Sequence, residues 1–183
     1  MLFLGYVGYL LYDFYYGSNY EIARAEEYLA EYGHLSSELK DDLFMGRDDF
    51  AVEFGEAYAT IEIPVIDLKL PIIYGTEMEH LRHGIGHDPS TWFPGDGNQI
   101  FLSGHNDSAF LQIGKLEKGD TIVIRTAYGK YEYEVDYTEI GDETETWRVG
   151  ETEEETLVLM TCYPFFSLTR PSERYFVYAA PVE

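Results

Sequence analysis

Apolar and polar positions alternate through most of the chain from about residue 59, which predicts a domain built mainly of β-strands. The segment 59–76 reads ATIEIPVIDLKLPIIYGT, and Pro64 and Pro71 divide it into short strands. Residues 98–105, NQIFLSGH, predict a strand that ends at His105. Short runs of this kind outnumber helical ones, as is typical of a closed barrel or a sandwich.

The second half of the chain predicts a hairpin followed by two more strands. Two alternating runs within residues 120–141 surround Tyr128 and Gly129, which supply the turn. An acidic loop follows over residues 141–155, and the segments TLVLMTC (156–162) and RYFVYAAPV (174–182) give the last two strands. The connection between 76 and 98 reads as short helix and loop.

The first 57 residues have a different pattern. Residues 1–12 carry no charge, but this run is shorter than the roughly 20 residues that a membrane-spanning helix needs. A buried amphipathic helix is one interpretation. We favour the outer end of a membrane anchor over residues 1–17, truncated upstream, with an interfacial aromatic belt. That belt comprises Tyr12, Phe14, Tyr15 and Tyr16.

Good helix formers over about 19–43 predict a second helical segment, with Gly33 as its stop. The chain therefore divides into an anchor end (1–17), a juxtamembrane helix and linker (18–57) and a folded domain (58–183).

Charge narrows the possible partners. The chain has 34 Asp and Glu against 12 Lys and Arg, a formal net charge of −22. Such a protein repels nucleic acid, so we expect no nucleic-acid partner. Adaptation to a salt-rich habitat explains this acidity, and so does a surface composition that has no functional meaning; the two explanations are equally good. Phosphate-binding loops of the GxxxxGK[ST] type, HExxH and CxxC motifs do not occur in the sequence.

The single cysteine, Cys162, stands at the end of an apolar run and cannot form an intramolecular disulfide. A lone cysteine in this position is usually a small core residue. The alternative is a nucleophile held at the rim of a sheet, which requires a histidine nearby. His105 also ends a strand, so the two side chains meet at one rim if their strands are parallel neighbours.

A cation completes this candidate site. Arg174 opens the last strand, and an antiparallel return from the cysteine strand brings it beside Cys162. There a guanidinium stabilises an oxyanion and helps to hold a thiolate. The alternative is a surface arginine paired with Glu173 or another acid, and Arg170 is a weaker candidate for the same role. The remaining histidines are expected to be structural or solvent-facing: His34, His80, His83 and His87.

Four segments in this order, LSGHNDSAF, GKLEKGDTIVI, TLVLMTCYPF and RYFVYA, resemble the sortase family, and TCYPF followed by RYFVYA is most similar to its class D group. The resemblance covers about residues 61–180. It implies an eight-stranded sortase-type β-barrel with short helices, preceded by an N-terminal helix. It also implies a bacterial cell-surface enzyme, held in the membrane by a single N-terminal pass.

The chemistry that the resemblance implies is cysteine transpeptidation. Cys162 attacks an LPxT-type sorting signal after Thr, His105 is the general acid and base, and Arg174 stabilises the oxyanion. Thr161 is implied to contact the substrate. The partners are surface proteins with a C-terminal sorting signal and an amine of a peptidoglycan precursor or a pilin. A thiol protease acting on the same peptides and a catalytically silent peptide-binding barrel remain alternatives.

Two positions depart from the family pattern: Val158 replaces the usual Thr of the cysteine signature, and Asn106 replaces an Arg common in class D. We expect little effect of Val158 on the fold, and an altered pocket near Asn106. We expect no cofactor, but the acidic loop raises a calcium alternative to a simply solvated loop. Its potential ligands are Asp142, Glu143, Glu145, Glu151, Glu153, Glu154 and Glu155.

Overall fold

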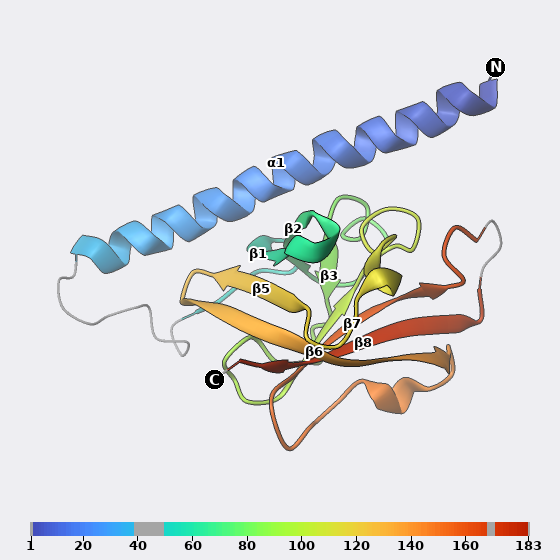
Figure 1. The fold of residues 1–183 in the computed structure, drawn as a ribbon. Helices are drawn as coiled ribbons and strands as arrows, with labels where there is room; N and C mark the ends of the chain where they lie inside the picture. Colours follow the sequence, from blue (N-terminus) through green and yellow to red (C-terminus); the bar gives the residue numbers. More distant parts are fainter. Residues whose placement is uncertain (1, 39–49, 168–170, 183) are drawn as a thin grey trace.

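The computed structural model describes residues 2–38, 50–167 and 171–182. Its strands close into a barrel in the order β1-β2-β3-β4-β7-β8-β6-β5 (Figure 1). The strands are β1 (Ala57–Ile63), β2 (Leu68–Tyr74), β3 (Ile85–His87), β4 (Gln99–Ser103), β5 (Thr121–Thr126), β6 (Gly129–Asp142), β7 (Thr156–Tyr163) and β8 (Glu173–Pro181). The predicted eight-stranded barrel is therefore confirmed.

Two neighbouring pairs in the barrel, β2 with β3 and β4 with β7, are parallel, and the others are antiparallel. The predicted hairpin is β5 and β6, which pair from Thr126 and Gly129 outward. Among the described residues, short 3₁₀ turns lie in three connections: η2 (Pro64–Ile66), η3 (Ile113–Lys115) and η4 (Thr146–Arg148). The stretch between β2 and β4 was expected to hold a short helix, but it contains turns and strand β3 instead. Residues Ile85 to His87 form this strand by pairing in parallel with the end of β2.

Alternate residues of each strand fill the barrel interior, as the period of two requires. Ile61, Leu157, Leu159 and Val177 are completely buried in this core. Burying a side chain of this size contributes about 1.5–3 kcal/mol. A second, small apolar cluster lies on the opposite face of β4, β7 and β8, and it consists of Phe101, Val158 and Phe176.

Helix α1 (Leu2–Glu38) lies along one side of the barrel, beside β1 and β2 (Figure 1). The division into an anchor end, a juxtamembrane segment and a catalytic domain stays a prediction. One helix runs through both Gly17 and Gly33, so the predicted stop at Gly33 is wrong. Packing explains this continuity. Gly17 allows the helix to approach the ring of His83, and Ala25 is completely buried against Ala57 and Ile73.

Two ion pairs add to this contact between helix and barrel. The Nε of Arg82 lies 2.8 Å from a carboxylate oxygen of Asp13, and the Nζ of Lys69 lies 2.8 Å from one of Glu26. Within the described part of the chain, α1 and the short turns lack a stretch apolar and long enough to span a bilayer.

The segment before β1 belongs structurally to the barrel. Phe50 is buried in the main core, with its ring 4.9 Å from that of Tyr128 and 5.8 Å from that of Tyr58. The end of the expected linker therefore contributes an aromatic side chain to the core, although it lies outside any strand.

Gly17 offers a test of how α1 is held. A Cβ atom there would lie 2.1 Å from the His83 ring, whereas one at Gly8 would meet nothing within 4 Å. Overpacking costs about 1–3 kcal/mol, so Gly17→Ala should weaken amide protection along α1 in hydrogen exchange. Gly8→Ala should leave it equal or stronger, because alanine favours helix by about 1 kcal/mol. Equal protection in both variants would show that this close approach does not hold the helix.

Candidate active site

The parallel pairing of β4 with β7 brings His105 and Cys162 to one end of the barrel. Ser103 is paired with Met160, and His105 and Cys162 each lie two residues further along. The alignment continues past the strand end, because the amide of Gly104 donates to the carbonyl of Met160 at 3.1 Å. Both side chains are partly exposed, so Cys162 is not the core residue of the simpler interpretation.

The strand period places the candidate residues on the outer face of the barrel. Leu157 and Leu159 point into the core, whereas Val158 and Met160 belong to the outer apolar cluster. Cys162 follows in the outward series, since side chains alternate along a strand. His105 follows Phe101 and Ser103 in the same way.

Arg174 lies directly opposite Cys162. The two are paired in the antiparallel register of β7 and β8, next to the pair Thr161 and Tyr175. Such neighbours have Cβ atoms about 4.5–5.5 Å apart. Phe176, two residues on from Arg174, lies in the outer cluster, so the three predicted residues share one face and one end of three adjacent strands.

The guanidinium of Arg174 is held by carbonyl and carboxylate oxygens. Its Nη1 donates to the carbonyls of Pro171 and Glu173, each at 2.9 Å, and its Nη2 donates to a carboxylate oxygen of Glu143 at 2.9 Å. The side chain is 16% exposed. The ion pair predicted as the alternative role is thus present, with Glu143, and it coexists with the position beside Cys162.

The loops that follow His105 and Cys162 are joined to each other. The side-chain amide of Asn106 donates to the carbonyl of Pro164 at 3.0 Å. Beyond that contact, the ring of Phe165 lies so close to Gly114 of η3 that a Cβ there would be 2.5 Å from it. Asn106, at the position where an arginine is common in class D, therefore links the two strand ends.

A groove of about 590 Å³ runs along the same outer face. Its floor includes Ser103, Met160 and Phe176, and Arg174 lines it next to the strand ends. One side includes Thr76 and Asp88. The other side, formed by the end of β6 and the loop that follows it, consists of Asp142, Glu143, Glu145, Thr146, Arg148 and Val149. The volume is in the range of sites that bind small molecules or short peptide segments.

Residues 61–182 match the family model described as the sortase domain. This chain belongs to the sortase family. It is therefore a cysteine transpeptidase, as the sequence predicted. Sortase D of Bacillus subtilis (strain 168) is 38% identical over 142 residues, which cover 77% of this chain and 72% of that protein.

Solved structures agree with the fold of this sortase. The catalytic domain of B. anthracis SrtD is 30% identical, with a TM-score of 0.61, and the match covers 75% of this chain and 97% of that one. The Clostridium perfringens Sortase D5 transpeptidase gives a TM-score of 0.71 at 24% identity, covering 91% of this chain and all of that one.

The other predicted residues of the sortase lie in different surroundings. Thr161 is 1% exposed, and its hydroxyl donates to the carbonyl of Gly104 at 2.7 Å, so it supports the strand end that leads to His105. Its contact with substrate stays a prediction. His87 is completely buried and shares a hydrogen bond of 2.7 Å with the hydroxyl of Tyr58. Arg170 lies outside the described residues, as does the side chain of His34.

The two remaining histidines lie between β2 and β3. His83 faces Asp13 of α1 at 3.4 Å, and His80 is buried against the ring of Phe54. His80 also forms, with Glu77 and Glu79, the one set of three potential metal ligands within 4.8 Å of each other among the residues described. The Nδ1 of His80 already accepts from the amide of Glu77 at 3.3 Å.

Several carboxylates of the acidic loop bind protein groups. Asp142 accepts from the amide and hydroxyl of Thr144, Glu143 contacts Arg174, and Glu145 contacts Arg148. Glu155, at the far end, accepts from two backbone amides and from the hydroxyl of Tyr133. A calcium ion held by these four side chains would replace those contacts.

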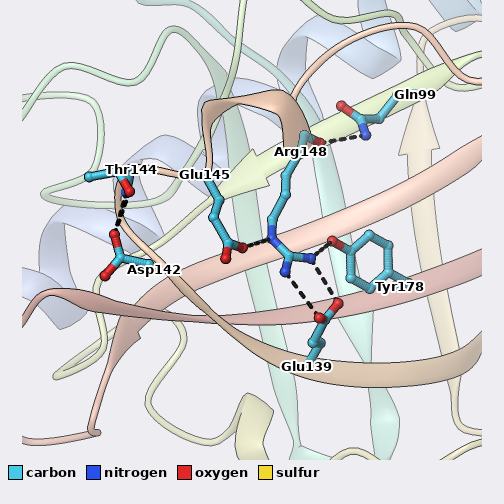
Figure 2. Close-up of polar contacts among 7 residues, drawn as sticks. All are labelled: Gln99, Glu139, Asp142, Thr144, Glu145, Arg148 and Tyr178. Atoms are coloured by element: carbon cyan, nitrogen blue, oxygen red, sulfur yellow. Dashed lines mark hydrogen bonds and ion pairs between the residues drawn. The ribbon is translucent and has the colours of Figure 1, made fainter.

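Arg148 is the residue of this region that the sequence did not identify. Its side chain is only 6% exposed, and it contacts the carboxylates of Glu139 and Glu145 and the hydroxyl of Tyr178 (Figure 2). The spacing of Glu145 and Arg148 in an acidic loop was the only available signal. Glu139 and Tyr178 come from β6 and β8, which no local pattern connects.

Acid should weaken this network. The hydrogen bonds from Arg148 hold the pKa of Glu139 below its usual value, so the ionised form is favoured by folding. The stabilisation is therefore present above the unfolded pKa of about 4.3 and is lost as the pH falls through the lower folded value. We expect Glu139→Gln to lower the free energy of unfolding at pH 7 and to have progressively less effect from pH 5 to pH 3.

Urea denaturation at each pH measures this difference. Glu134→Gln, at an exposed position on the same strand, corrects for the general loss of negative charge. A penalty for Glu139→Gln that stays constant from pH 7 to pH 3 would contradict the expected titration.

Proposed function

We propose that this sortase cleaves an LPxT-type sorting signal after Thr and joins the acyl group to an amine of the cell wall or a pilin. The observation that carries this proposal is the strand register, which aligns His105, Cys162 and Arg174 on one outer face beside a groove. The family supplies the reaction class, and the groove supplies room for an extended peptide.

In the proposed mechanism, the thiolate of Cys162 attacks the carbonyl carbon of the Thr residue, and the carbonyl π electrons move to oxygen. The tetrahedral intermediate collapses as the C–N bond breaks, and the imidazolium of His105 gives its proton to the leaving amine. The incoming amine then attacks the thioester, neutral His105 takes its proton, and the thiolate leaves. The new amide replaces the broken one, so no outside oxidant or energy source is needed.

Arg174 is proposed to stabilise the oxyanion of both tetrahedral intermediates. Its contacts within the described residues use three of the five N–H donors of a guanidinium. The other two donate to no group among the described residues, and in this partly buried position a bond from them to a substrate oxygen would be strengthened. The ion pair with Glu143 holds the guanidinium in its orientation beside Cys162.

Peptide turnover tests this proposal directly. The full chain is incubated with LPxTG, LPxTA and LAxTG peptides and an amine, and the products are read by mass spectrometry. We expect an acyl–amine product that Cys162→Ala reduces by about a thousandfold or more, since the nucleophile is lost. Arg174→Lys should reduce kcat by about a hundredfold, whereas Arg125→Lys, on β5, should have no effect.

Other results would change the assignment. Hydrolysis without amine transfer would support the thiol protease, and binding without turnover would support the silent barrel. Turnover that persists in Cys162→Ala would overturn the mechanism. The same assay in excess chelator decides the calcium alternative, and we expect full activity there because four loop carboxylates already bind protein groups.

We also propose that the N-terminal half of α1 faces a membrane at the cell surface. Tyr12, Tyr15 and Tyr16 are each more than half exposed, and the rings of Tyr12 and Tyr16 lie 4.2 Å apart. Phe14, expected in the same belt, packs against the barrel core instead. Exposed tyrosines on one helix suit the interface between lipid and water.

Sedimentation with neutral phosphatidylcholine vesicles tests this orientation, since anionic lipids would repel a chain of net charge −22. Replacing Tyr12, Tyr15 and Tyr16 by serine should reduce the bound fraction several-fold, because it removes the exposed rings. Tyr137→Ser, on the barrel, is the matched control and should bind as the parent does. Equal loss in both variants would argue against an interfacial helix.

A further inference from the structure

The loop between β6 and β7 is fastened at its centre by Arg148. The guanidinium of Arg148 forms two hydrogen bonds with Glu139, at 2.8 and 3.0 Å, one with Glu145 at 2.6 Å and one with the Tyr178 hydroxyl at 2.9 Å. Figure 2 shows these contacts converging on one side chain from β6, β8 and the loop itself. The aromatic rings of Trp147 and Phe176 lie 4.7 and 4.8 Å from its central carbon.

The backbone of the same turn is fixed as well. Gln99, at the start of β4, donates to the carbonyl of Arg148 and accepts from the amide of Gly150, both at 2.9 Å. Gly141 leaves the space that the network occupies, since a Cβ there would lie 2.6 Å from a Glu145 oxygen and 2.9 Å from the Nε of Arg148. Three strands and the loop are thus joined through one turn.

This fastened loop forms one side of the groove. Phe176 lies beneath the guanidinium. The residues of this segment that line the groove are Asp142, Glu143, Glu145, Thr146, Arg148 and Val149. The loop also carries Glu143, which binds Arg174 at 2.9 Å. Arg148 therefore lies in the same loop as the groove wall and as the carboxylate that binds Arg174.

We propose that Arg148 is a positioning residue for transpeptidation, which holds the β6–β7 loop as a preformed wall of the groove and keeps Glu143 on Arg174. This inference rests on the proposed function. Its physical basis is preorganisation: a bidentate, largely buried guanidinium allows few alternative loop positions, so a peptide does not have to order the loop on binding. An ammonium group has no planar fork and cannot reproduce this set of contacts.

The test uses Arg148→Met and Glu145→Gln in the full chain, with Arg125→Met as the matched control. Arg125 is exposed on β5 and lies 3.6 Å from Glu62, away from the groove. We expect Arg148→Met to lower kcat/KM for the sorting peptide by about 10- to 100-fold, mostly through KM. Glu145→Gln should do so more weakly, and Arg148→Lys should not restore the parent value.

Alkylation of Cys162 by iodoacetamide separates positioning from general damage. This small reagent does not depend on the groove wall, so its rate should fall much less than kcat/KM does in each variant. Hydrogen exchange should speed up in residues 143–150 and not in β4 or β7. If Arg148→Met unfolds the barrel, the kinetics of Glu145→Gln test the positioning role, because this variant removes only one of the ion pairs of Arg148.

The outcomes are distinct. Kinetics of Arg148→Met and Glu145→Gln that match Arg125→Met would overturn the inference, even with a lowered melting temperature, since the role would then be structural. Failure of the parent chain to process any sorting peptide would refute the proposed function instead. In that case, unchanged exchange of residues 143–150 in Arg148→Met would also refute the fastening of the loop.

Discussion

Parallel pairing of β4 with β7 is the constraint on which the site depends. A parallel pair needs a long connection between its strands, and here that connection contains β5, β6 and the acidic loop. The pairing gives the two strands a common direction, so both chains leave the sheet at the same end. β8 then returns beside β7 and adds Arg174. His105, Cys162 and Arg174 come from three different segments of the chain. They lie at one end of the sheet because of the directions of β4, β7 and β8, not because they are neighbours in the sequence.

Because side chains alternate along β7, the residue that supports the strand end and the proposed nucleophile lie on opposite faces of the sheet. Thr161 points inward and binds the carbonyl of Gly104, whereas the next residue, Cys162, is partly exposed on the other face. A shift of one residue in register would exchange their roles and bury the thiol. The interior is filled by large aliphatic side chains such as Leu157 and Leu159, which makes such a shift costly.

Sequence patterns predicted the features that depend on nearby residues. The apolar runs that end at His105 and Cys162 and the turn at Gly129 gave the strands and the hairpin, because period and turn chemistry are local properties. The extent of α1 was missed because glycine is a poor helix residue and the helix runs through both Gly17 and Gly33. At Gly17, the close approach to His83 and the packing of α1 on β1 override that preference. The partners of Arg148 were missed for a related reason, since Glu139 and Tyr178 approach it only once the barrel closes.

Closure of the barrel also limits how a peptide can be recognised. Each strand in the order β1-β2-β3-β4-β7-β8-β6-β5 has a neighbour on both sides, so no strand of the described barrel lies at an outer edge of the sheet. An extended substrate therefore finds no free edge strand to extend, which is how many other proteins hold peptides. The groove offers side chains and loops to its backbone amides and carbonyls instead. Discrimination between substrates then rests on a few loop residues, which can change in evolution without disturbing the barrel beneath them.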